Sequence, residues 1–212
     1  MNLILLGAPG AGKGTQAELL VKALSIPAIS TGNMLRDAMN HKTPLGEQVR
    51  QIMDSGMLVP DDVVLDLVSR RVARDDCKNG FILDGVPRTL SQAEALDAAG
   101  IIVDYVISIE IDDSVIEGRM TGRRVCPQCG SSYHVANNPP KSEGICDNCG
   151  TQLVIRKDDA PETVRHRLEI YHASTEILKR YYEAQGKLRL VEGNQAIEGC
   201  RDQILSVIGA KV

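Results

Sequence analysis

The sequence predicts an α/β fold in which a parallel five-stranded sheet is flanked by helices. Three observations support this prediction. Short apolar, β-rich runs alternate with helical patterns, a glycine-rich segment directly follows the first apolar run, and 43% of the 212 residues are hydrophobic. Aromatic residues make up only 3% of the chain, so we expect a core of Leu, Ile, Val, Met and Ala.

Five apolar runs are candidate strands, and candidate helices fill the intervals between them. The strands are expected at residues 2–6, 28–30, 81–84, 105–109 and 188–191. Two helix starts can be placed by their capping residues. Pro44 at a first helical position, with Thr43 as cap, predicts a helix over 44–54, and Asp61 is expected to cap a helix over 62–74.

Thr89 and Gln92 have the spacing of a capping box, which predicts a helix that ends at Gly100. The remaining helices are expected at residues 12–24, 113–121, 161–185 and 197–208. The longest of them should turn one stripe of side chains inward, formed by Thr163, Arg167, Ile170, Ser174, Ile177 and Leu178.

Two stretches break the alternation of strands and helices. Residues 31–60 hold two short helical patterns where one crossover helix would be enough. Residues 122–159 contain Gly, Pro, Asn and Cys without a helical or long strand period. Both stretches are therefore predicted to be insertions into the core fold.

Composition limits the kinds of partner that the protein can have. A net charge of −4 argues against general binding of nucleic acid or anionic membranes. No stretch approaches the roughly 18 apolar residues that span a bilayer, and no basic region precedes the first apolar run. We expect a soluble, cytoplasmic, monomeric protein.

Residues 7–15, GAPGAGKGT, have the character of a loop that holds phosphates. Glycine lets the backbone approach a ligand closely, the next helix offers the positive end of its dipole, and Lys13 adds a mobile positive charge. The alternative is a generic glycine turn beside a lysine. In the usual pattern a hydroxyl residue directly follows the lysine and binds Mg²⁺, whereas here Gly14 intervenes before Thr15.

Four of the six cysteines form two C-x-x-C pairs, each followed by glycine. Two such knuckles can offer four thiolates to a structural metal ion, with zinc favoured over iron. A redox-active dithiol is the alternative. The predicted ligands are Cys126, Cys129, Cys146 and Cys149. His134 lies nearby but is expected at the solvated surface, because the four cysteines already complete the site.

The cysteine segment is not a strong candidate for nucleic-acid binding. Between Gly122 and Ala160 five basic residues stand against four acidic ones, and Tyr133 is the one aromatic residue. This composition offers neither a basic field nor a surface for base stacking. We therefore interpret the segment as a structural clip.

Several further segments complete a resemblance to a known family. Residues 30–36 (STGNMLR) come after the second strand, residues 81–89 (FILDGVPRT) cover the third strand and the turn after it, and arginines flank the cysteine segment. Together with the glycine loop, this set resembles adenylate kinase in its long-lid form with a metal-binding lid. The resemblance runs from Met1 to at least Arg167. Two departures occur: Asn33 stands where many relatives have Asp, and Val86 where Phe is common.

The resemblance implies a P-loop NTPase-like core with two mobile insertions. The core would comprise residues 1–29, 60–121 and 160–212. Residues 30–59 would form the AMP-binding helical insert, and residues 122–159 a zinc-ribbon-like lid. The implied reaction is reversible transfer of the γ-phosphoryl group of MgATP to AMP, giving two ADP and maintaining the adenine nucleotide balance. Mg²⁺ would accompany ATP, and Zn²⁺ would be structural.

The phosphate oxygen of AMP that attacks is already anionic, so positioning and charge stabilisation would account for catalysis without a general base. By resemblance the catalytic residues are Lys13, Asp84 near Mg²⁺, Arg88, Arg123, Arg156 and Arg167. The ATP-binding residues would be Gly10, Ala11, Gly12, Lys13, Gly14, Thr15, Arg119, Arg123, Ser132, Tyr133 and Gln195. The AMP-binding residues would be Thr31, Arg36, Met57, Leu58, Val59, Gly85, Val86, Pro87, Arg88, Gln92, Arg156 and Arg167.

Some residues have competing or simpler interpretations. Gln92 can cap its helix or contact the AMP adenine, and Asp84 can be a turn residue ahead of Gly85. The resemblance alone implies that Asp158 and Asp159 pair with lid arginines when the lid closes. Surface ion pairs are expected for Arg50, Arg70, Arg71, Arg74 and Arg201, and ordinary thiols for Cys77 and Cys200.

Two other functions stay open from the sequence. One is a different nucleoside monophosphate kinase with the same core, for example a GTP:AMP phosphotransferase. The other is a non-enzymatic metal-ribbon module that binds a nucleotide.

Overall fold

The computed structural model describes residues 1–210, which form two compact units. The first, here called the sheet unit, contains residues 1–31 and 60–111 and the chain from residue 170 onward. The second, the insert unit, contains residues 32–59 and 112–169. The two segments predicted as insertions thus fall largely within the insert unit. The division into a core and two separately mobile domains stays a prediction.

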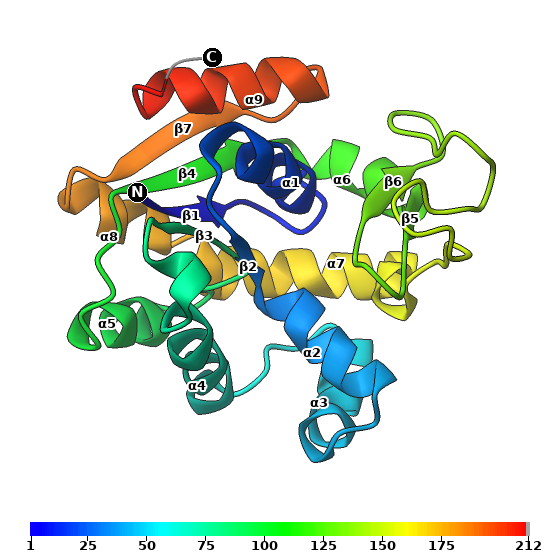
Figure 1. Cartoon of the computed structure of the whole chain (residues 1–212), viewed down its shortest axis with the longest axis horizontal. Coiled ribbons are helices and arrows are strands. Elements are labelled where there is room, and N and C mark those ends of the chain that lie inside the picture. Colours follow the sequence, from blue (N-terminus) through cyan, green and yellow to red (C-terminus); the bar gives the residue numbers. More distant parts are fainter. Residues whose placement is uncertain (211–212) are drawn as a thin grey trace. The chain divides into compact units, whose positions relative to one another are not determined.

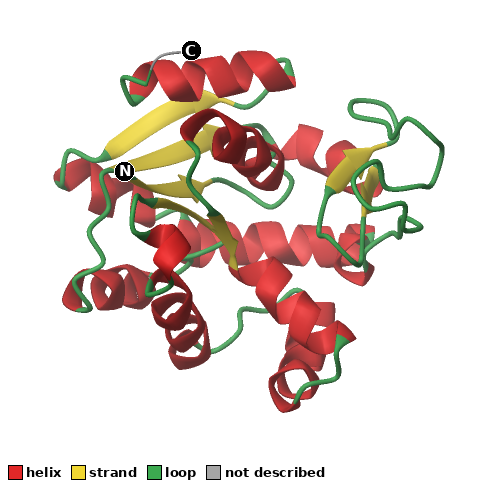
Figure 2. Cartoon of the chain, viewed as in Figure 1, coloured by secondary structure: helices red, strands yellow, loops and turns green. Residues whose placement is uncertain are grey.

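The sheet unit is built on five parallel strands in the order β2-β3-β1-β4-β7 (Figures 1 and 2). Their bounds are Asn2–Leu6 for β1, Ala28–Ser30 for β2, Phe81–Asp84 for β3, Tyr105–Glu110 for β4 and Leu188–Glu192 for β7. All five strands were predicted within one residue at each end. The α/β class and the parallel sheet are therefore confirmed.

The central strand β1 explains the position of the glycine loop. Leu3, Ile4 and Leu5 are at most 1% exposed, because β1 lies between β3 and β4 and helices cover the sheet. Parallel strands end at the same edge, so the loop after β1 begins beside the end of β3, where Asp84 pairs with Leu5. A Cβ atom on Gly7 would lie 2.7 Å from the carbonyl oxygen of Ile109, so only glycine fits at this step.

Helices α1 (Lys13–Leu24) and α9 (Ile197–Val207) pack against one another and against the sheet. Their buried side chains, such as Leu20 and Ile204, join the same apolar cluster as Leu3 of β1. Helix α8 (Leu178–Ala184) packs on β7 and on α5 (Leu90–Ala98), which in turn contacts α4 (Asp61–Val72). A short 3₁₀ turn, η1, spans Asp75–Cys77.

The predicted capping role of Asp61 is wrong. Helix α4 begins at Asp61 itself, has Pro60 at its N-cap without a side-chain cap, and ends at Val72 rather than at residue 74. The Asp61 carboxylate instead accepts hydrogen bonds from the start of α5. A tertiary contact has therefore replaced the local contact that the sequence suggested.

The predicted single helix over residues 161–185 is also wrong. The structure has α7 (Pro161–Ile170), a π-helical turn η3 (Tyr171–Thr175) and then α8. The wide turn is closed by a hydrogen bond from the Glu176 N–H to the Tyr171 carbonyl oxygen (2.9 Å). The buried positions among residues 161–178 are Val164, Tyr171, Thr175 and Leu178, so the predicted inward stripe is right at Leu178 but wrong at Ile177, which is 50% exposed.

The insert unit holds helices and short strands from both insertions. Helix α2 spans Thr31–Asn40, its first residue lying in the sheet unit, and α3 spans Pro44–Asp54. The other elements are α6 (Asp113–Thr121), β5 (Arg123–Val125), β6 (Ser132–His134), the 3₁₀ turn η2 (Lys157–Asp159) and α7. Strands β5 and β6 are antiparallel. As predicted, the Thr43 hydroxyl caps α3 by accepting from the Gly46 N–H (3.1 Å).

Gly46 lets α2 and α3 approach closely. A Cβ atom at this position would lie 2.1 Å from the carbonyl oxygen of Ala38, so Gly46→Ala must push the two helices apart. We expect Gly46→Ala to lower the free energy of unfolding by about 1–3 kcal/mol. Gly118 of α6 is the matched control, because a Cβ there meets nothing within 4 Å. Gly118→Ala should be neutral or stabilise by up to about 1 kcal/mol.

Urea unfolding of both variants checks this prediction. Equal midpoints for Gly46→Ala and Gly118→Ala would contradict the close approach of α2 and α3.

Among the described residues, no helix is both long and apolar enough to cross a membrane.

Candidate functional site

The glycine loop forms a concave turn at the N-terminus of α1. Gly7, Gly10 and Gly12 all have positive φ angles, and Gly12 at φ +103° is the N-cap of the helix. The Lys13 ammonium group donates to the carbonyl oxygens of Gly7 (2.7 Å) and Ala8 (2.9 Å). The lysine side chain therefore folds over its own loop, where its charge and the helix N-terminus act on the same space.

Asp84 ends β3 at the same edge of the sheet. A Cβ atom on Gly14 would lie 3.9 Å from Asp84 Oδ2, so this carboxylate borders the glycine loop. Carboxylate oxygens beside a phosphate-binding loop suit Mg²⁺, which commonly takes one or two carboxylates together with water and phosphate oxygens. The donor set at this edge thus fits the predicted magnesium ion.

The segment after β3 gathers polar groups around one carbonyl. The Gly85 carbonyl oxygen accepts from the Thr31 hydroxyl (3.1 Å) and from Arg88 Nε (2.9 Å). Gly85 has φ +81°, and a Cβ there would come within 3.1 Å of Arg88 Nη2. The next bond, Val86–Pro87, is cis. Glycine is needed here because a side chain would displace the guanidinium group.

Gln92 is fully engaged within the sheet unit. It is 1% exposed, its Oε1 accepts from the Arg88 N–H (2.7 Å), and its Nε2 donates to Asp61 Oδ1 (2.7 Å). The Thr89 hydroxyl accepts from the Gln92 N–H, as the capping prediction required. The return bond, however, goes to Arg88 rather than to Thr89. A contact between the second Nε2 hydrogen and an adenine stays a prediction.

Asp61 is the common acceptor of this group. Its burial alone would raise the pKa of its carboxyl group, but hydrogen bonds from Ser91, Gln92 and Thr89 outweigh burial and hold this pKa below its usual range. The carboxylate is therefore charged and accepts from three side chains at the start of α5. Sequence analysis missed this role because nothing local to Asp61 signals it.

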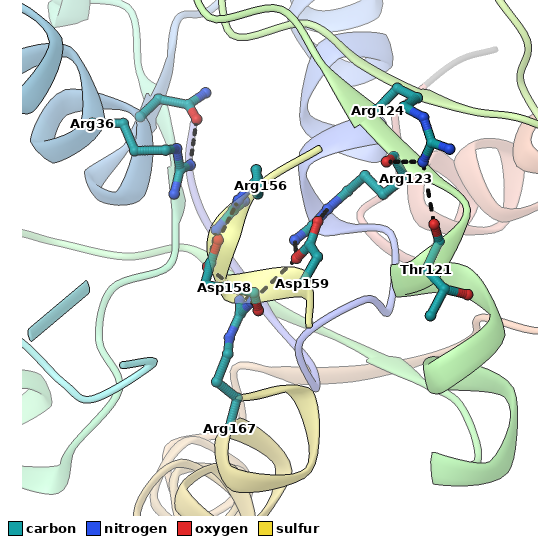
Figure 3. A network of polar contacts seen from close by, with 9 residues as sticks. Arg36, Thr121, Arg123, Arg124, Arg156, Asp158, Asp159 and Arg167 are labelled. Atoms are coloured by element: carbon teal, nitrogen blue, oxygen red, sulfur yellow. Dashed lines mark hydrogen bonds and ion pairs between the residues drawn. The ribbon is translucent and has the colours of Figure 1, made fainter. Parts of the chain in front are cut away.

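Four arginines and two aspartates meet in the insert unit (Figure 3). Arg123 binds Asp159 with two parallel hydrogen bonds, one of them 2.8 Å from Nε to Oδ2. Arg156 binds Asp158 in the same bidentate way. Arg167 from α7 joins the pairs, since its Nη1 lies 2.9 Å from Asp158 Oδ2 and 3.5 Å from Asp159 Oδ1. Asp158 and Asp159 thus pair with Arg156 and Arg123, and the predicted dependence of this pairing on closure of the lid stays a prediction.

Like charges lie close together in this cluster. Burial would raise the pKa of Asp158, but the guanidinium groups of Arg156 and Arg167 hold it well below its usual range. Burial and the neighbouring Arg156 lower the pKa of Arg36 to about 9, which still leaves it charged at neutral pH. The guanidinium groups of Arg156, Arg123 and Arg167 all repel the charge of Arg36 in this half-buried place. A multiply charged anion would relieve this repulsion.

Other predicted nucleotide contacts can be placed only within their own unit. Val59 is buried, whereas Met57 is 49% exposed and its sulfur lies 3.1 Å from His166 Nε2. Arg119 is in the last turn of α6. The Gln195 amide donates to the Glu192 carbonyl oxygen (2.7 Å) in the turn after β7. Nucleotide binding by these residues stays a prediction.

The four predicted metal ligands converge. Their sulfur atoms all lie within 4.8 Å of one another, with 3.4 Å between Cys126 and Cys149 and 3.5 Å between Cys129 and Cys146. Sulfurs bound to one zinc ion at about 2.3 Å in a tetrahedron lie about 3.8 Å apart, so the geometry fits zinc. The apolar cluster of this segment contains only Cys126, Tyr133, Cys146 and Leu153. An ion would therefore supply much of its stability.

Tyr133 packs into the cluster of four cysteines. Its side chain is 8% exposed, its hydroxyl lies 3.5 Å from Cys146 Sγ, and it accepts from the Asp147 N–H (2.8 Å). Burial would raise the pKa of Cys146, but hydrogen bonds from Tyr133 and from the backbone of Asn148 and Cys149 lower it to about 6. The predicted contact of Tyr133 with ATP stays a prediction, and it would have to use the backbone.

The two knuckles brace each other reciprocally. Gln128 and Asn148 occupy the same position in their C-x-x-C pairs. The Thr151 hydroxyl donates to the Gln128 side chain, and the Asn148 amide donates to the Ser131 hydroxyl (2.7 Å). Each hydroxyl also lies beside a sulfur of its own knuckle: Ser131 Oγ is 3.2 Å from Cys129, and Thr151 Oγ1 is 3.4 Å from Cys149.

His134 organises a turn instead of joining the metal ligands. Its Nδ1 accepts from the backbone N–H groups of Ala136 and Asn137, both at 3.1 Å.

Of the arginines predicted in surface ion pairs, Arg50, Arg70, Arg71 and Arg201 have carboxylate partners. Cys77 and Cys200 are buried cysteines.

A glycine loop at the carboxyl edge of a parallel sheet, with an acidic residue beside it, is the arrangement found in P-loop phosphotransferases. The family model described as "Adenylate kinase" matches residues 5–187. The chain belongs to the adenylate kinase family. The predictions of family, enzyme class and adenylate kinase function are thereby confirmed, and the alternative donor specificity is not favoured.

Relatives match along almost the whole chain. The sequence is 51% identical to an adenylate kinase of Caldicellulosiruptor bescii over 99% of both chains. It is 50% identical to that of Caldicellulosiruptor saccharolyticus over the full length of both. It is 52% identical to that of Carboxydothermus hydrogenoformans over 93% of this chain and 94% of the relative.

Proposed function

We propose that this enzyme transfers the γ-phosphoryl group of MgATP to AMP and back, and that its own arginines account for most of the catalysis. The observation that carries the proposal is the gathering of four guanidinium groups, those of Arg36, Arg123, Arg156 and Arg167, around Asp158 and Asp159. Guanidinium groups stay charged at neutral pH and bind phosphate oxygens with two N–H groups at once. They suit a reaction that must bring several phosphates together.

The donor nucleotide would occupy the glycine loop. Backbone N–H groups of residues 10–15 at the N-terminus of α1 would hold the β- and γ-phosphates, and Lys13 would exchange its carbonyl partners for phosphate oxygens. When bound, Mg²⁺ neutralises charge on the phosphates, and Asp84 at the loop edge would hold it through water. Arg119, Arg123, Ser132, Tyr133 and Gln195 would complete the ATP site.

The acceptor nucleotide would be held by groups around Thr31, Gly85 and Gln92, with residues 57–59 lining its base. Arg36 and Arg88 would grip the AMP phosphate. The attacking oxygen of AMP is already anionic, so no residue needs to remove a proton. Arg123, Arg156 and Arg167 would then trade their bonds to Asp158 and Asp159 for bonds to the transferring group. The two aspartates would keep the guanidinium groups gathered until phosphate arrives.

The metal of the cysteine cluster would be zinc in a structural role. Four protein ligands leave no open coordination position, so the ion would not touch substrate. We further propose that the enzyme acts as a cytoplasmic monomer.

Phosphate-acceptor preference tests the proposed reaction. In a coupled assay with MgATP on metal-replete protein, we expect AMP to be phosphorylated with a kcat/KM at least about 100-fold above GMP, UMP or CMP, because buried polar groups reject the wrong base. The same assay with MgGTP in place of MgATP measures donor preference. Comparable rates for AMP and GMP would contradict the assignment of the acceptor pocket.

A further inference from the structure

The main chain of Arg88 is held from both sides by buried side chains of the sheet unit. Its N–H donates to Gln92 Oε1 (2.7 Å), and its carbonyl oxygen accepts from the Thr175 hydroxyl (2.8 Å). Gln92 is 1% exposed and Thr175 is 8% exposed. Loop residues are ordinarily the more mobile part of a fold, and two buried hydrogen bonds on one residue restrict that mobility.

Further hydrogen bonds fix the Gln92 side chain, which accepts from the Arg88 N–H. Gln92 Nε2 donates to Asp61 Oδ1 (2.7 Å), and Asp61 Oδ2 accepts from the hydroxyls of Thr89 (3.0 Å) and Ser91. The first turn of α4 is thereby tied to the first turn of α5. The orientation of the Gln92 amide, and with it the bond to the Arg88 N–H, is set by a charged acceptor.

The hydrogen bond to the Arg88 carbonyl oxygen comes from the π-helical turn η3. Its i→i+5 hydrogen bond, from the Glu176 N–H to the Tyr171 carbonyl oxygen (2.9 Å), adds one residue to the turn. Thr175, the last residue of this turn, donates its hydroxyl to a carbonyl that lies 87 residues away in the sequence. π-Helical turns are rare and occur often at functional sites. Here the last residue of the turn supplies the donor to the Arg88 carbonyl oxygen.

We propose that Thr175 is a positioning residue for Arg88, and that Asp61 supports the same arginine from the other side through Gln92. The inference rests on the proposed role of Arg88 in binding the AMP phosphate. Arg88 Nε donates to the Gly85 carbonyl oxygen (2.9 Å). Because the main chain of Arg88 is fixed as well, the plane of the guanidinium group and the positions of its terminal N–H groups are fixed. A bidentate phosphate contact requires that placement.

Two substitutions at one position separate positioning from packing. Thr175→Val keeps the shape of the side chain and removes the hydroxyl, whereas Thr175→Ser keeps the hydroxyl. We expect Thr175→Val to lower kcat/KM for AMP by about 10- to 100-fold, because a shift of about 1 Å at a reacting group can cost that much. The KM for ATP should stay within about twofold of the parent enzyme's value. Thr175→Ser should keep most of the parent enzyme's kcat/KM for AMP.

A double variant distinguishes this inference from the proposed function. In an Arg88→Ala background, Thr175→Val should lower kcat/KM for AMP no further. Near-normal turnover of Arg88→Ala alone would overturn the role of Arg88. A damaged Arg88→Ala enzyme combined with an unchanged Thr175→Val enzyme would overturn only the positioning role. If Thr175→Val lowered kcat/KM for ATP and for AMP equally, that result would also overturn only the positioning role.

Asp61→Asn provides the test if Thr175→Val fails to fold. This variant removes the charge of the acceptor and leaves Thr175 and the π-helical turn unaltered. We expect the same selective loss of kcat/KM for AMP, with the KM for ATP unchanged. Normal AMP kinetics in folded Asp61→Asn protein would overturn the inference.

Discussion

Replacing Arg88 by alanine should lower kcat about 10²- to 10³-fold while the protein stays folded, since removing one fixed donor to a developing charge costs about that much in enzymes. The guanidinium group of Arg88 contacts the Gly85 carbonyl oxygen, and its place is secured by the bonds of its main chain. We therefore expect its side chain to contribute little to the core and much to the proposed acceptor site. Steady-state kinetics and thermal unfolding of the same sample check both halves of this prediction.

Arg70→Ala is the matched control for Arg88→Ala. Arg70 pairs with Asp66 on the exposed face of α4, and its side chain is 78% exposed. Exposed ion pairs contribute little to stability, so this variant should have normal turnover and a nearly unchanged melting temperature. An Arg88→Ala enzyme as active as Arg70→Ala would remove Arg88 from the site.

Chelating the metal should lower the melting temperature strongly and the activity at low temperature much less. The apolar cluster of the cysteine segment contains four side chains, two of which are ligands themselves. Such a cluster cannot hold the segment alone, and binding of zinc to four thiolates can supply on the order of 10 kcal/mol. We therefore expect the segment to unfold first, with the sheet unit keeping its own core.

Calorimetry before and after chelation, with an assay at low temperature on the same material, measures this effect. Zinc added back should restore the original melting profile, which controls for damage caused by the chelator. An unchanged melting profile with lost chemistry would assign the ion to catalysis and contradict its structural role.

Features with local signals were predictable from the sequence. Pro44 and Thr43 fixed the start of α3, because a helix cap is decided within one turn. The glycine loop and its lysine were placed correctly, since positive φ angles at Gly7, Gly10 and Gly12 need no distant partner. The metal cluster could be inferred from cysteine spacing, because a short C-x-x-C turn brings its own two sulfurs together.

Features decided by distant contacts were not predictable. The helical pattern over residues 161–185 continues without a break, and nothing in it indicates the π-helical turn whose last residue, Thr175, donates to the Arg88 carbonyl oxygen. Asp61 has the position of a helix cap, yet its partners Thr89 and Gln92 lie 28 and 31 residues further along the chain. At Asp61 and at Thr175, hydrogen bonds to residues far away in the sequence outweigh what the local sequence favours.

The reciprocal amide–hydroxyl bonds between the two knuckles have a consequence for how the metal centre assembles. Gln128 reaches across to Thr151, and Asn148 to Ser131, so neither half is complete without its counterpart. A half-formed lid would have only two thiolates and no neighbour to orient them. Metal uptake should accordingly be concerted, with occupancy passing from none to full without a stable two-cysteine intermediate.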